Sequence, residues 1–292
     1  MRVFSGIRPT GELHIGNYFG AIKQWIELQE KHDCVFCIVD LHAVTTPYLP
    51  ENLQKNILDL AVAYLAAGLD PEKCILFVQS QVKEHAELAW LLGTFTPLGE
   101  LKRMTQFKEK SKKHPEYVNA GLLNYPLLMA ADILLYKTDS VPVGIDQEQH
   151  VELAREIARK FNKMFGEVFK EPKVLLPKIG QKIMSAVTDL GRIIKDDPLK
   201  KPGISNLLTI YSLFSGKKIK DLEKNFKGRG YEEFKKSLTK LLIETLEPLG
   251  KKRKELLSRE VYVKEILEQC RKRAQVIAQS TMAEVKKKMG LI

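Results

Sequence analysis

Cysteine is scarce in this sequence, and long apolar runs are missing. Only four cysteines occur among 292 residues, and their spacing is too sparse and irregular for a disulfide framework. No apolar segment is long enough to cross a bilayer, and the first residues follow a strand pattern instead of that of a signal peptide. We therefore expect a cytoplasmic protein that has no membrane partner.

Two of the four cysteines, Cys34 and Cys37, form a C-x-x-C sequence inside an apolar run that predicts a β-strand. Residues three apart on a strand point to opposite faces of the sheet, so a shared metal ion or disulfide is not expected there. We predict that the cysteines are structural and that the protein itself holds no metal.

The charge of the chain is distributed unevenly. Residues 1–185 contain equal numbers of basic and acidic side chains, so the whole net charge of +11 belongs to residues 186–292. Basic clusters in that part, Lys251 to Lys254, Arg271 to Arg273 and Lys286 to Lys288, would suit a phosphate backbone. The alternative is a solvated basic surface of a heat-tolerant protein.

Short apolar runs alternate with helical periodicity in the first part of the chain. The runs predict strands at Arg2 to Ser5, Val35 to Val39 and Cys74 to Val78, separated by helices at about 15–31, 51–67 and 83–93. This alternation predicts an α/β fold with a parallel sheet between helices. Ligands of such sheets bind beyond the carboxyl ends of the strands.

The rest of the chain is predominantly helical. A helical insertion is expected at about 97–140, and after residue 186 every segment has helical periodicity, ending in a long helix from about Val261 to Met289. We therefore predict a catalytic α/β domain over 1–185 and an all-helical domain over 186–292.

The segment from Phe4 to Asn17 joins a strand end, a turn with glycine and proline, and the start of a helix. Free backbone N–H groups at a helix start attract anions, which favours a site for a polyphosphate. His14 and Asn17 share one helical face, and Gly16 would let a ligand approach the backbone. The alternative is that His14 is only a surface residue at a helix start.

Two later segments also have polar residues in an apolar setting. Asp132 lies within the otherwise apolar helix from Asn124 to Tyr136, one turn after Met129, and Tyr125 lies nearly one turn earlier still. A carboxylate there could accept an N–H from a flat heteroaromatic ligand, or could pair with an arginine or the backbone. Asp146 follows Gly144 after an apolar stretch and could accept from ribose hydroxyls or cap a helix.

Two further segments are weaker candidates. Lysines in the run from Met104 to Lys113 could neutralise phosphates, although such a run is usually a solvated helix face. His42 follows the second predicted strand at the edge where ligands bind, although a buried, hydrogen-bonded histidine is the usual explanation for such a residue.

Taken in order, these segments resemble the tryptophanyl-tRNA synthetases, class I aminoacyl-tRNA synthetases with a Rossmann-type catalytic domain. His14-Ile15-Gly16-Asn17 is similar to the HIGH signature of that family, with Asn17 in place of the final histidine. The resemblance implies a catalytic role for His14, Asn17 and Lys110. It assigns ATP contacts to Arg8, Pro9, Thr10, Gly16, Asn17, Gly144, Ile145, Asp146 and Ile183. It assigns the indole N–H of tryptophan to Asp132, and the rest of the amino-acid pocket to Phe4, His42, Tyr125, Met129, Val141, Val143 and Gln147.

The resemblance also implies a reaction and partners. Such an enzyme activates L-tryptophan with ATP and Mg²⁺ to tryptophanyl-adenylate and pyrophosphate, and then transfers the aminoacyl group to tRNA(Trp). Positioning and charge stabilisation carry this chemistry, with little covalent work by the protein. A homodimer and an anticodon-binding role for residues 186–292 are further expectations from the family.

One family element is missing from this sequence. The KMSKS segment of the family should follow the stretch that here ends Ile183-Met184-Ser185, but Ala186 comes next and resembles the residue after the missing loop. Either the sequence leaves out a loop of the intact protein, or the loop was deleted by engineering, or the chain is a natural variant without activation activity.

Two rival functions remain open at this stage. Tyrosyl-tRNA synthetases share the fold and the order of motifs, although Asp132 and the run from Met104 to Lys108 match the tryptophan family better. A noncatalytic tRNA-binding protein derived from a synthetase would explain the missing segment.

Overall fold

The computed structural model describes residues 1–11, 18–113, 115–175 and 194–292. Five predicted or aligned positions therefore lie outside the described residues: His14, Gly16, Asn17, Ile183 and the junction of Ser185 with Ala186. The side chains of Lys110 and Ile145 also lie outside the description, although their backbones are included.

The centre of the molecule is a five-stranded parallel sheet with the strand order β3-β2-β1-β4-β5. Its inner strands are apolar on both faces because helices cover both sides, as a parallel sheet requires. The structure confirms the predicted parallel α/β fold, and it adds two short strands, β4 and the edge strand β5, to the three that the sequence predicted. The strands are β1 Arg2–Ile7, β2 Asp33–Ile38, β3 Cys74–Val78, β4 Ser140–Pro142 and β5 Lys173–Leu175.

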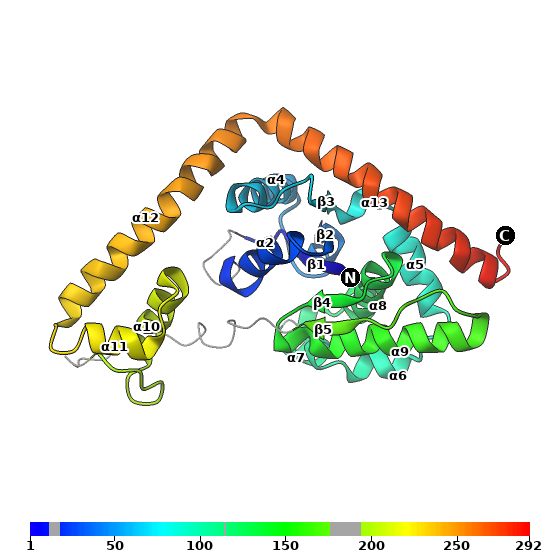
Figure 1. Cartoon of the computed structure of the whole chain (residues 1–292). Coiled ribbons are helices and arrows are strands. Elements are labelled where there is room, and N and C mark those ends of the chain that lie inside the picture. Colours follow the sequence, from blue (N-terminus) through cyan, green and yellow to red (C-terminus); the bar gives the residue numbers. More distant parts are fainter. Residues whose placement is uncertain (12–17, 114, 176–193) are drawn as a thin grey trace.

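Helices pack on both faces of the sheet (Figure 1). Local sequence sets their ends; α4 begins at Pro50, in the first turn where a missing N–H costs nothing, and ends at Gly68 with a φ of 117°. None of the described helices is long and apolar enough to cross a membrane. The longer helices of this part are α4 Pro50–Ala67, α5 Glu84–Gly93, α7 Thr105–Lys113, α8 Ala120–Leu135 and α9 Glu148–Phe165; the shorter ones are α2 Lys23–Gln29, α3 Asp40–Ala43 and α6 Leu98–Arg103.

Short turns connect several of these elements. A π-helical turn at Tyr18–Ile22 leads directly into α2, and 3-10 turns occur at Gln79–Gln81, Pro115–Tyr117 and Ile145–Gln147. Two of the 3-10 turns follow a strand within a few residues, so they bring polar side chains to the carboxyl edge of the sheet.

Helix α8 is the most apolar helix against the sheet. The side chain of Asn119 caps it by accepting a hydrogen bond from the Leu122 N–H at 2.9 Å. Tyr125, Met129, Asp132 and Tyr136 follow one another along this helix at intervals of three or four residues, so they lie on one face. That face is turned toward the carboxyl ends of the strands, and it supplies the floor of the candidate site.

The regular secondary structure in the described C-terminal part is all helical, as the sequence predicted, and short turns and loops connect the helices. Its helices are α10 Pro202–Ser215, α11 Ile219–Asn225, α12 Tyr231–Ser258 and α13 Glu260–Lys288. α12 and α13 meet near Arg259 at an angle and enclose the sheet from two sides (Figure 1).

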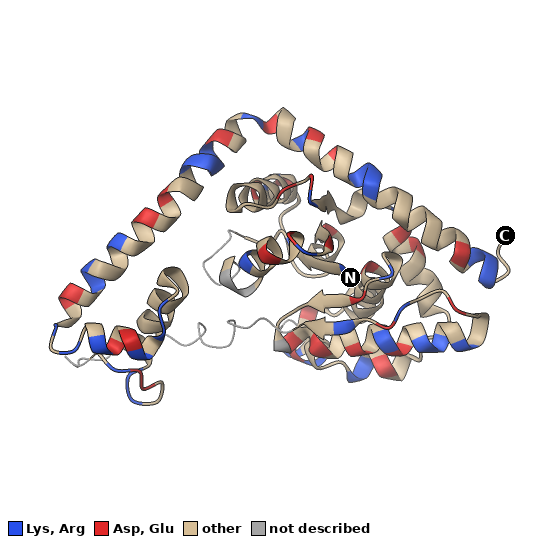
Figure 2. Ribbon diagram, viewed as in Figure 1, with Lys and Arg blue, Asp and Glu red and all other residues tan. Residues whose placement is uncertain are grey.

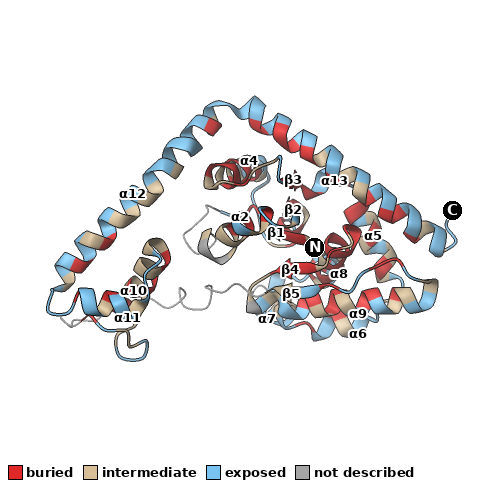
Figure 3. Ribbon diagram, in the orientation of Figure 1, coloured by how far each residue is buried: buried red, intermediate tan, exposed pale blue. Residues whose placement is uncertain are grey.

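Two hydrophobic cores divide these helices. The start of α12 joins α10 and α11 around a small core of Ile204, Leu208, Leu222, Phe226 and Phe234. α13 instead packs against β3 and α5 and belongs to the core of the sheet. Figure 3 shows its buried stripe beside the largely exposed surface of α12. The division at 185 and 186 stays a prediction, but the last helix shares the core of the first part.

The cysteines are buried and free, in agreement with the structural role predicted for them. Cys34 and Cys74 are register partners on neighbouring strands. Burial raises the pKa of both thiols to about 12. Neither thiol therefore ionises near neutral pH, and both contribute to packing alone.

Two valines of α13 test its place in the core. Val263 is fully buried, whereas Val261 is 72% exposed. Val263→Ala should lower the free energy of unfolding by about 2 kcal/mol because it leaves a cavity in the main hydrophobic core. Val261→Ala should change that free energy by less than about 0.5 kcal/mol. Urea unfolding measures both; equal effects would mean that Val263 does not belong to that core.

Candidate functional site

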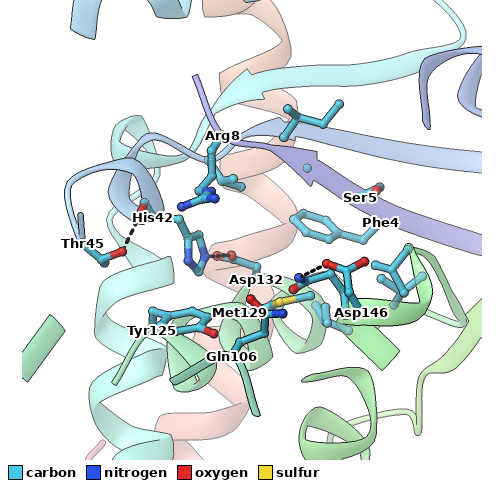
Figure 4. A pocket seen from close by; sticks show the side chains of 17 residues that line it. Phe4, Ser5, Arg8, His42, Thr45, Gln106, Tyr125, Met129, Asp132 and Asp146 are labelled. Atoms are coloured by element: carbon cyan, nitrogen blue, oxygen red, sulfur yellow. Dashed lines mark hydrogen bonds and ion pairs between the residues drawn. The ribbon is translucent and has the colours of Figure 1, made fainter. Parts of the chain in front are cut away.

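A cavity of about 430 Å³ lies beyond the carboxyl ends of β1 and β2, between the sheet and α8 (Figure 4). This is the edge at which parallel sheets bind their ligands. Apolar and aromatic side chains form most of the wall, and polar groups gather at the bottom and at the mouth. The lining residues are Phe4, Ser5, Gly6, Ile7, Arg8, Val39, His42, Thr45, Gln106, Tyr125, Met129, Asp132, Ile133, Val141, Val143, Asp146 and Gln147.

Asp132 lies at the bottom of this cavity and is 1% exposed. Three side chains donate hydrogen bonds to its carboxylate. His85 Nδ1 and Gln79 Nε2 lie 2.6 and 2.7 Å from Oδ1, and His42 Nε2 lies 2.8 Å from Oδ2. Among the residues that the structure describes, the carboxylate therefore pairs with neither an arginine nor the backbone, the alternative that the sequence left open.

The three donors come from segments that follow two neighbouring strands. His42 belongs to α3, which begins directly after β2, and Gln79 follows β3 at once. His85 lies in the first turn of α5, a few residues later. Because β2 and β3 are parallel, their carboxyl ends bring these side chains to one place.

The hydrogen bonds determine the charge of Asp132. Burial alone would raise the pKa of the carboxyl group. Hydrogen bonds from His42 and His85 outweigh that effect and lower the pKa of Asp132 to about 2. The group is therefore a carboxylate throughout the physiological range.

A second carboxylate, that of Asp40, fixes the residue after Gln79, and the backbone of α3 fixes the Gln79 side chain. Asp40 accepts hydrogen bonds from the hydroxyl and the backbone N–H of Ser80, at 2.5 and 2.9 Å. Gln79 Oε1 accepts the N–H of Leu41 at 3.1 Å. Since the amide oxygen of Gln79 is fixed by that N–H, its NH₂ group must face Asp132.

The walls of the cavity form a slot for a flat ring. Phe4 stacks on Tyr136 with ring centroids 5.5 Å apart and planes 9° apart. Tyr125 closes another side, and its hydroxyl lies 2.9 Å from His150 Nε2. Met129 lies beside Asp132 in Figure 4. A planar apolar group with one N–H at its edge would fit such a slot.

The mouth of the cavity is polar. Arg8 lies just beyond the end of β1, and Asp146 and Gln147 follow β4 after a short link. Gln147 Nε2 donates to Asp146 Oδ2 at 2.7 Å, and Gln147 is the N-cap residue of α9. Asp146 therefore does not occupy the cap position that the sequence left open for it. A Cβ at Gly144 would lie 2.6 Å from Asp146 Oδ1, so any other residue here would require the exposed Asp146 side chain to move.

The cavity unites residues that the sequence assigned to two sites. Every side chain predicted for the ring pocket lines it, together with Arg8 and Asp146 from the predicted nucleotide set. Pro9 and Thr10 continue from Arg8, where the Thr10 N–H donates to the Arg8 carbonyl. Lys110 belongs to α7, and Gln106 of the same helix reaches the cavity.

Sequence reasoning missed three residues of the Asp132 network: Gln79, His85 and Tyr136. Gln79 directly follows a predicted strand, and the same position after the preceding strand led to the segment containing His42. That criterion would have identified Gln79. His85 and Tyr136 occur within helices, where the sequence alone does not distinguish a buried polar residue from an exposed one.

The C-terminal basic clusters are partly engaged within the molecule. Arg273 donates to the Pro71 carbonyl, Arg253 contacts Asp59, and Lys286 pairs with Glu87. Basic and acidic residues alternate along α12 (Figure 2). Lys217, Lys218, Lys220 and Lys227, around α11, are instead exposed. These lysines are the better candidates for contact with a polyanion.

A second, more open hollow of about 640 Å³ lies between α5, α6 and α8. Its surface is mainly apolar, and Trp90 and Leu98 at its border are 76% and 54% exposed. Thr45 and Tyr125 line both hollows. Within the residues that the structure describes, no group of three or more His, Cys, Asp or Glu side chains could hold a metal ion.

Comparison with known families gives a match over most of the chain. Residues 1–181 match the family of class I tRNA synthetases for W and Y, that is, for tryptophan and tyrosine. The chain is 49% identical to the tryptophan–tRNA ligase of Caldanaerobacter subterraneus subsp. tengcongensis, over 100% of this chain and 98% of that protein. It is 44% identical to the tryptophan–tRNA ligase of Helicobacter pylori, over 100% and 99%.

Solved structures agree with these sequence matches. The tryptophanyl-tRNA synthetase of Campylobacter jejuni in complex with ADP and tryptophan has a TM-score of 0.84 at 38% identity, covering 99% of this chain and 100% of that one. The enzyme of Mycoplasma pneumoniae has a TM-score of 0.88 at 32% identity, covering 99% and 97%.

The alignment with the Caldanaerobacter protein spans 325 positions, more than the 292 residues of this chain. That relative therefore has additional residues within the aligned span, which agrees with a missing internal segment.

Proposed function

Since this chain belongs to the class I tRNA synthetases for tryptophan and tyrosine and acts as a tryptophan–tRNA ligase, we propose that its cavity selects tryptophan through Asp132. The observation that carries this proposal is a buried, ionised carboxylate at the bottom of an aromatic slot. The indole ring of tryptophan has a single N–H at its edge, and that N–H would meet Asp132 Oδ2.

The energetic basis of the selection is the cost of an unpaired buried acceptor. Phenylalanine would fill part of the slot without a donor for Asp132, and a site built for a hydrogen bond rejects such an analogue strongly. Tyrosine does have a donor, the hydroxyl at the far end of its ring, so the shape of the slot must exclude it. Phe4, Val141 and Val143 form that part of the wall.

We assign ATP to the mouth of the cavity, beside the tryptophan slot. Arg8, Pro9 and Thr10 follow β1 there, and Gly144, Ile145 and Asp146 follow β4. The C. jejuni relative is a complex with ADP and tryptophan, which supports two adjacent sites. His14, Gly16, Asn17, Lys110 and Ile183 remain predicted contributors. Mg²⁺ would enter as part of the substrate, held by the ATP phosphates.

The proposed reaction proceeds in two steps. The tryptophan carboxylate attacks the α-phosphorus of ATP, an acyl–phosphate bond forms, and pyrophosphate leaves. A hydroxyl of the terminal ribose of tRNA(Trp) then attacks the acyl carbon, and AMP leaves. The slot fixes the amino acid, and the polar mouth places its carboxylate beside the nucleotide. Because ATP and tRNA are among its substrates, we propose that the enzyme works in the cytoplasm.

The helical lobe of α10, α11 and the start of α12 is proposed to bind tRNA. Its own small core makes it a stable unit, and its exposed lysines provide positive charge. We expect tRNA to contact this lobe instead of the cluster from Arg271 to Arg273, because Arg273 donates a hydrogen bond to the Pro71 carbonyl.

The enzyme is proposed to be a homodimer that uses the hollow bordered by Trp90. An exposed apolar surface of this kind favours association. A second copy is the proposed occupant. The shared walls, Thr45 and Tyr125, would connect the interface with the amino-acid slot.

The activity itself is tested by amino-acid-dependent exchange of pyrophosphate into ATP. We expect exchange with tryptophan and none with tyrosine. Insertion of the additional segment of the Caldanaerobacter protein between Ser185 and Ala186 should raise the rate by about a hundredfold or more, because it restores charge stabilisation of pyrophosphate. Tryptophan binding without exchange in both proteins would support the noncatalytic rival, and exchange with tyrosine would refute the assignment.

The tRNA surface is tested by the double variant Lys217→Glu, Lys218→Glu. Affinity for tRNA(Trp) should fall at least tenfold. The slope of log affinity against log salt concentration should become shallower by an amount that corresponds to the loss of about two phosphate contacts. Lys31→Glu, on an exposed turn before β2, is the matched control. Filter binding over a salt series measures both quantities, and parallel salt dependences for all three proteins would exclude this lobe as the contact.

The dimer is tested by Trp90→Glu. A charge within an apolar interface should convert the protein from dimer to monomer in sedimentation velocity. Val276→Glu, on the exposed side of α13, is the control and should remain dimeric. A dimeric Trp90→Glu protein would place the interface elsewhere.

A further inference from the structure

We propose that His85 is the positioning residue for tryptophan selection, holding Asp132 ionised and aimed into the slot without contacting the substrate. This inference rests on the proposed function and extends it. His85 is fully buried, and it is absent from the lining of the cavity. Its effect on the substrate must therefore pass through Asp132.

The donors of Asp132 are distributed unequally over its two oxygens. Oδ1 accepts from His85 and Gln79, neither of which lines the cavity. Oδ2 accepts only from His42 among the described residues, and His42 does line the cavity. A carboxylate oxygen accepts about two hydrogen bonds. Oδ1 is thus saturated from behind, and Oδ2 keeps one acceptor position for a ligand N–H.

Tyr136 determines which nitrogen of His85 carries the proton. The Tyr136 hydroxyl lies 2.9 Å from His85 Nε2. With the Nδ1 N–H donated to Asp132, Nε2 is the ring position left to accept the Tyr136 O–H. The ring cannot turn away, because Phe77 and Tyr136 pack on it with centroids 5.7 and 5.5 Å distant.

The chain of contacts also reaches the wall of the slot. The ring of Tyr136 stacks on Phe4, which lines the cavity. The side chain of Tyr136, the C-cap residue of α8, therefore sets both the tautomer of His85 and the position of an aromatic wall. The unit Tyr136, His85 and Asp132 links the shape of the slot to the direction of its acceptor.

The surroundings of Asp132 would otherwise favour a protonated carboxyl. The nearby acidic groups are Cys37 from β2, Asp40 from α3 and Glu84 from α5. Burial raises the pKa of the Cys37 thiol, so it is neutral, whereas Asp40 and Glu84 add negative potential. Arg8 at the mouth is the positive group of the cavity lining, and the hydroxyls of Tyr125 and Tyr136 are neutral. The donors His42, His85 and Gln79 therefore maintain the charge, and loss of one should raise the pKa of Asp132.

The test compares His85→Leu with His85→Asn. The Asn side chain can place its NH₂ near the former Nδ1 and restore the hydrogen bond, whereas Leu cannot. His32→Leu, outside the site, is the control. Isothermal calorimetry with the full chain measures dissociation constants for L-tryptophan and for L-3-benzothienylalanine, in which sulfur replaces the indole N–H. Binding is the readout because it does not require the KMSKS segment.

The variants are compared by their affinity for tryptophan and by their preference for tryptophan over benzothienylalanine. His85→Leu should bind tryptophan at least tenfold more weakly than the unsubstituted protein. The ratio of its dissociation constants for benzothienylalanine and tryptophan should be at least tenfold smaller. His85→Asn should recover both values to within about threefold, and His32→Leu should match the unsubstituted protein.

The pH dependence gives a second readout. The depressed pKa of Asp132 keeps the carboxylate, and hence tryptophan affinity, constant from about pH 8 to about pH 5. In His85→Leu the pKa of Asp132 rises, so the affinity should fall within that range as the pH is lowered.

Several results would overturn the proposal. Unchanged discrimination and a flat pH profile in His85→Leu would do so, and so would failure of His85→Asn to recover while it remains folded. If His85→Leu does not fold, Tyr136→Phe decides: it should weaken tryptophan binding about threefold, and no change would refute the relay. Absence of tryptophan binding by the unsubstituted protein would instead refute the proposed function.

Discussion

The structure around the site depends on one constraint: a carboxylate must remain ionised at the bottom of an apolar slot. Burying a charge costs several kcal/mol unless donors compensate it. Asp132 receives three such donors, from segments that follow β2 and β3, and two of them are histidines. The parallel sheet is what makes this possible, because it brings the ends of strands that are distant in sequence to the same edge.

The same arrangement divides the cavity into two chemical regions. The bottom is buried and aromatic, and we propose that it identifies the side chain of the amino acid by one hydrogen bond. The mouth is polar, with Arg8 and Asp146 provided by the segments after β1 and β4. α13 supports the bottom from outside the site, since it packs on β3 and α5 and so steadies the segments that hold Gln79 and His85. A helix far along the chain thereby contributes to the geometry of selection.

Much of this could be predicted from the sequence. Alternating apolar runs gave the first three strands, because buried parallel strands are apolar on both faces. Asp132 stood out as a lone acid in an apolar helix, and the ring-pocket residues assigned by resemblance do surround one cavity. The three-residue strand β5 has no comparable signal. His85 and Tyr136 were missed because their importance arises from contacts across 47 and 51 positions of sequence. The packing of α13 was missed because an amphipathic pattern does not reveal its partner.

The ionised state of Asp132 in the absence of ligand is the central claim. Infrared difference spectroscopy, with Asp132→Asn to identify the band, measures it directly. The account predicts that the Asp132 signal is that of a carboxylate from neutral pH down to about pH 4, and that addition of tryptophan shifts the signal as a new N–H donor arrives. A protonated carboxylic acid band near neutral pH, or no change on addition of tryptophan, would contradict it.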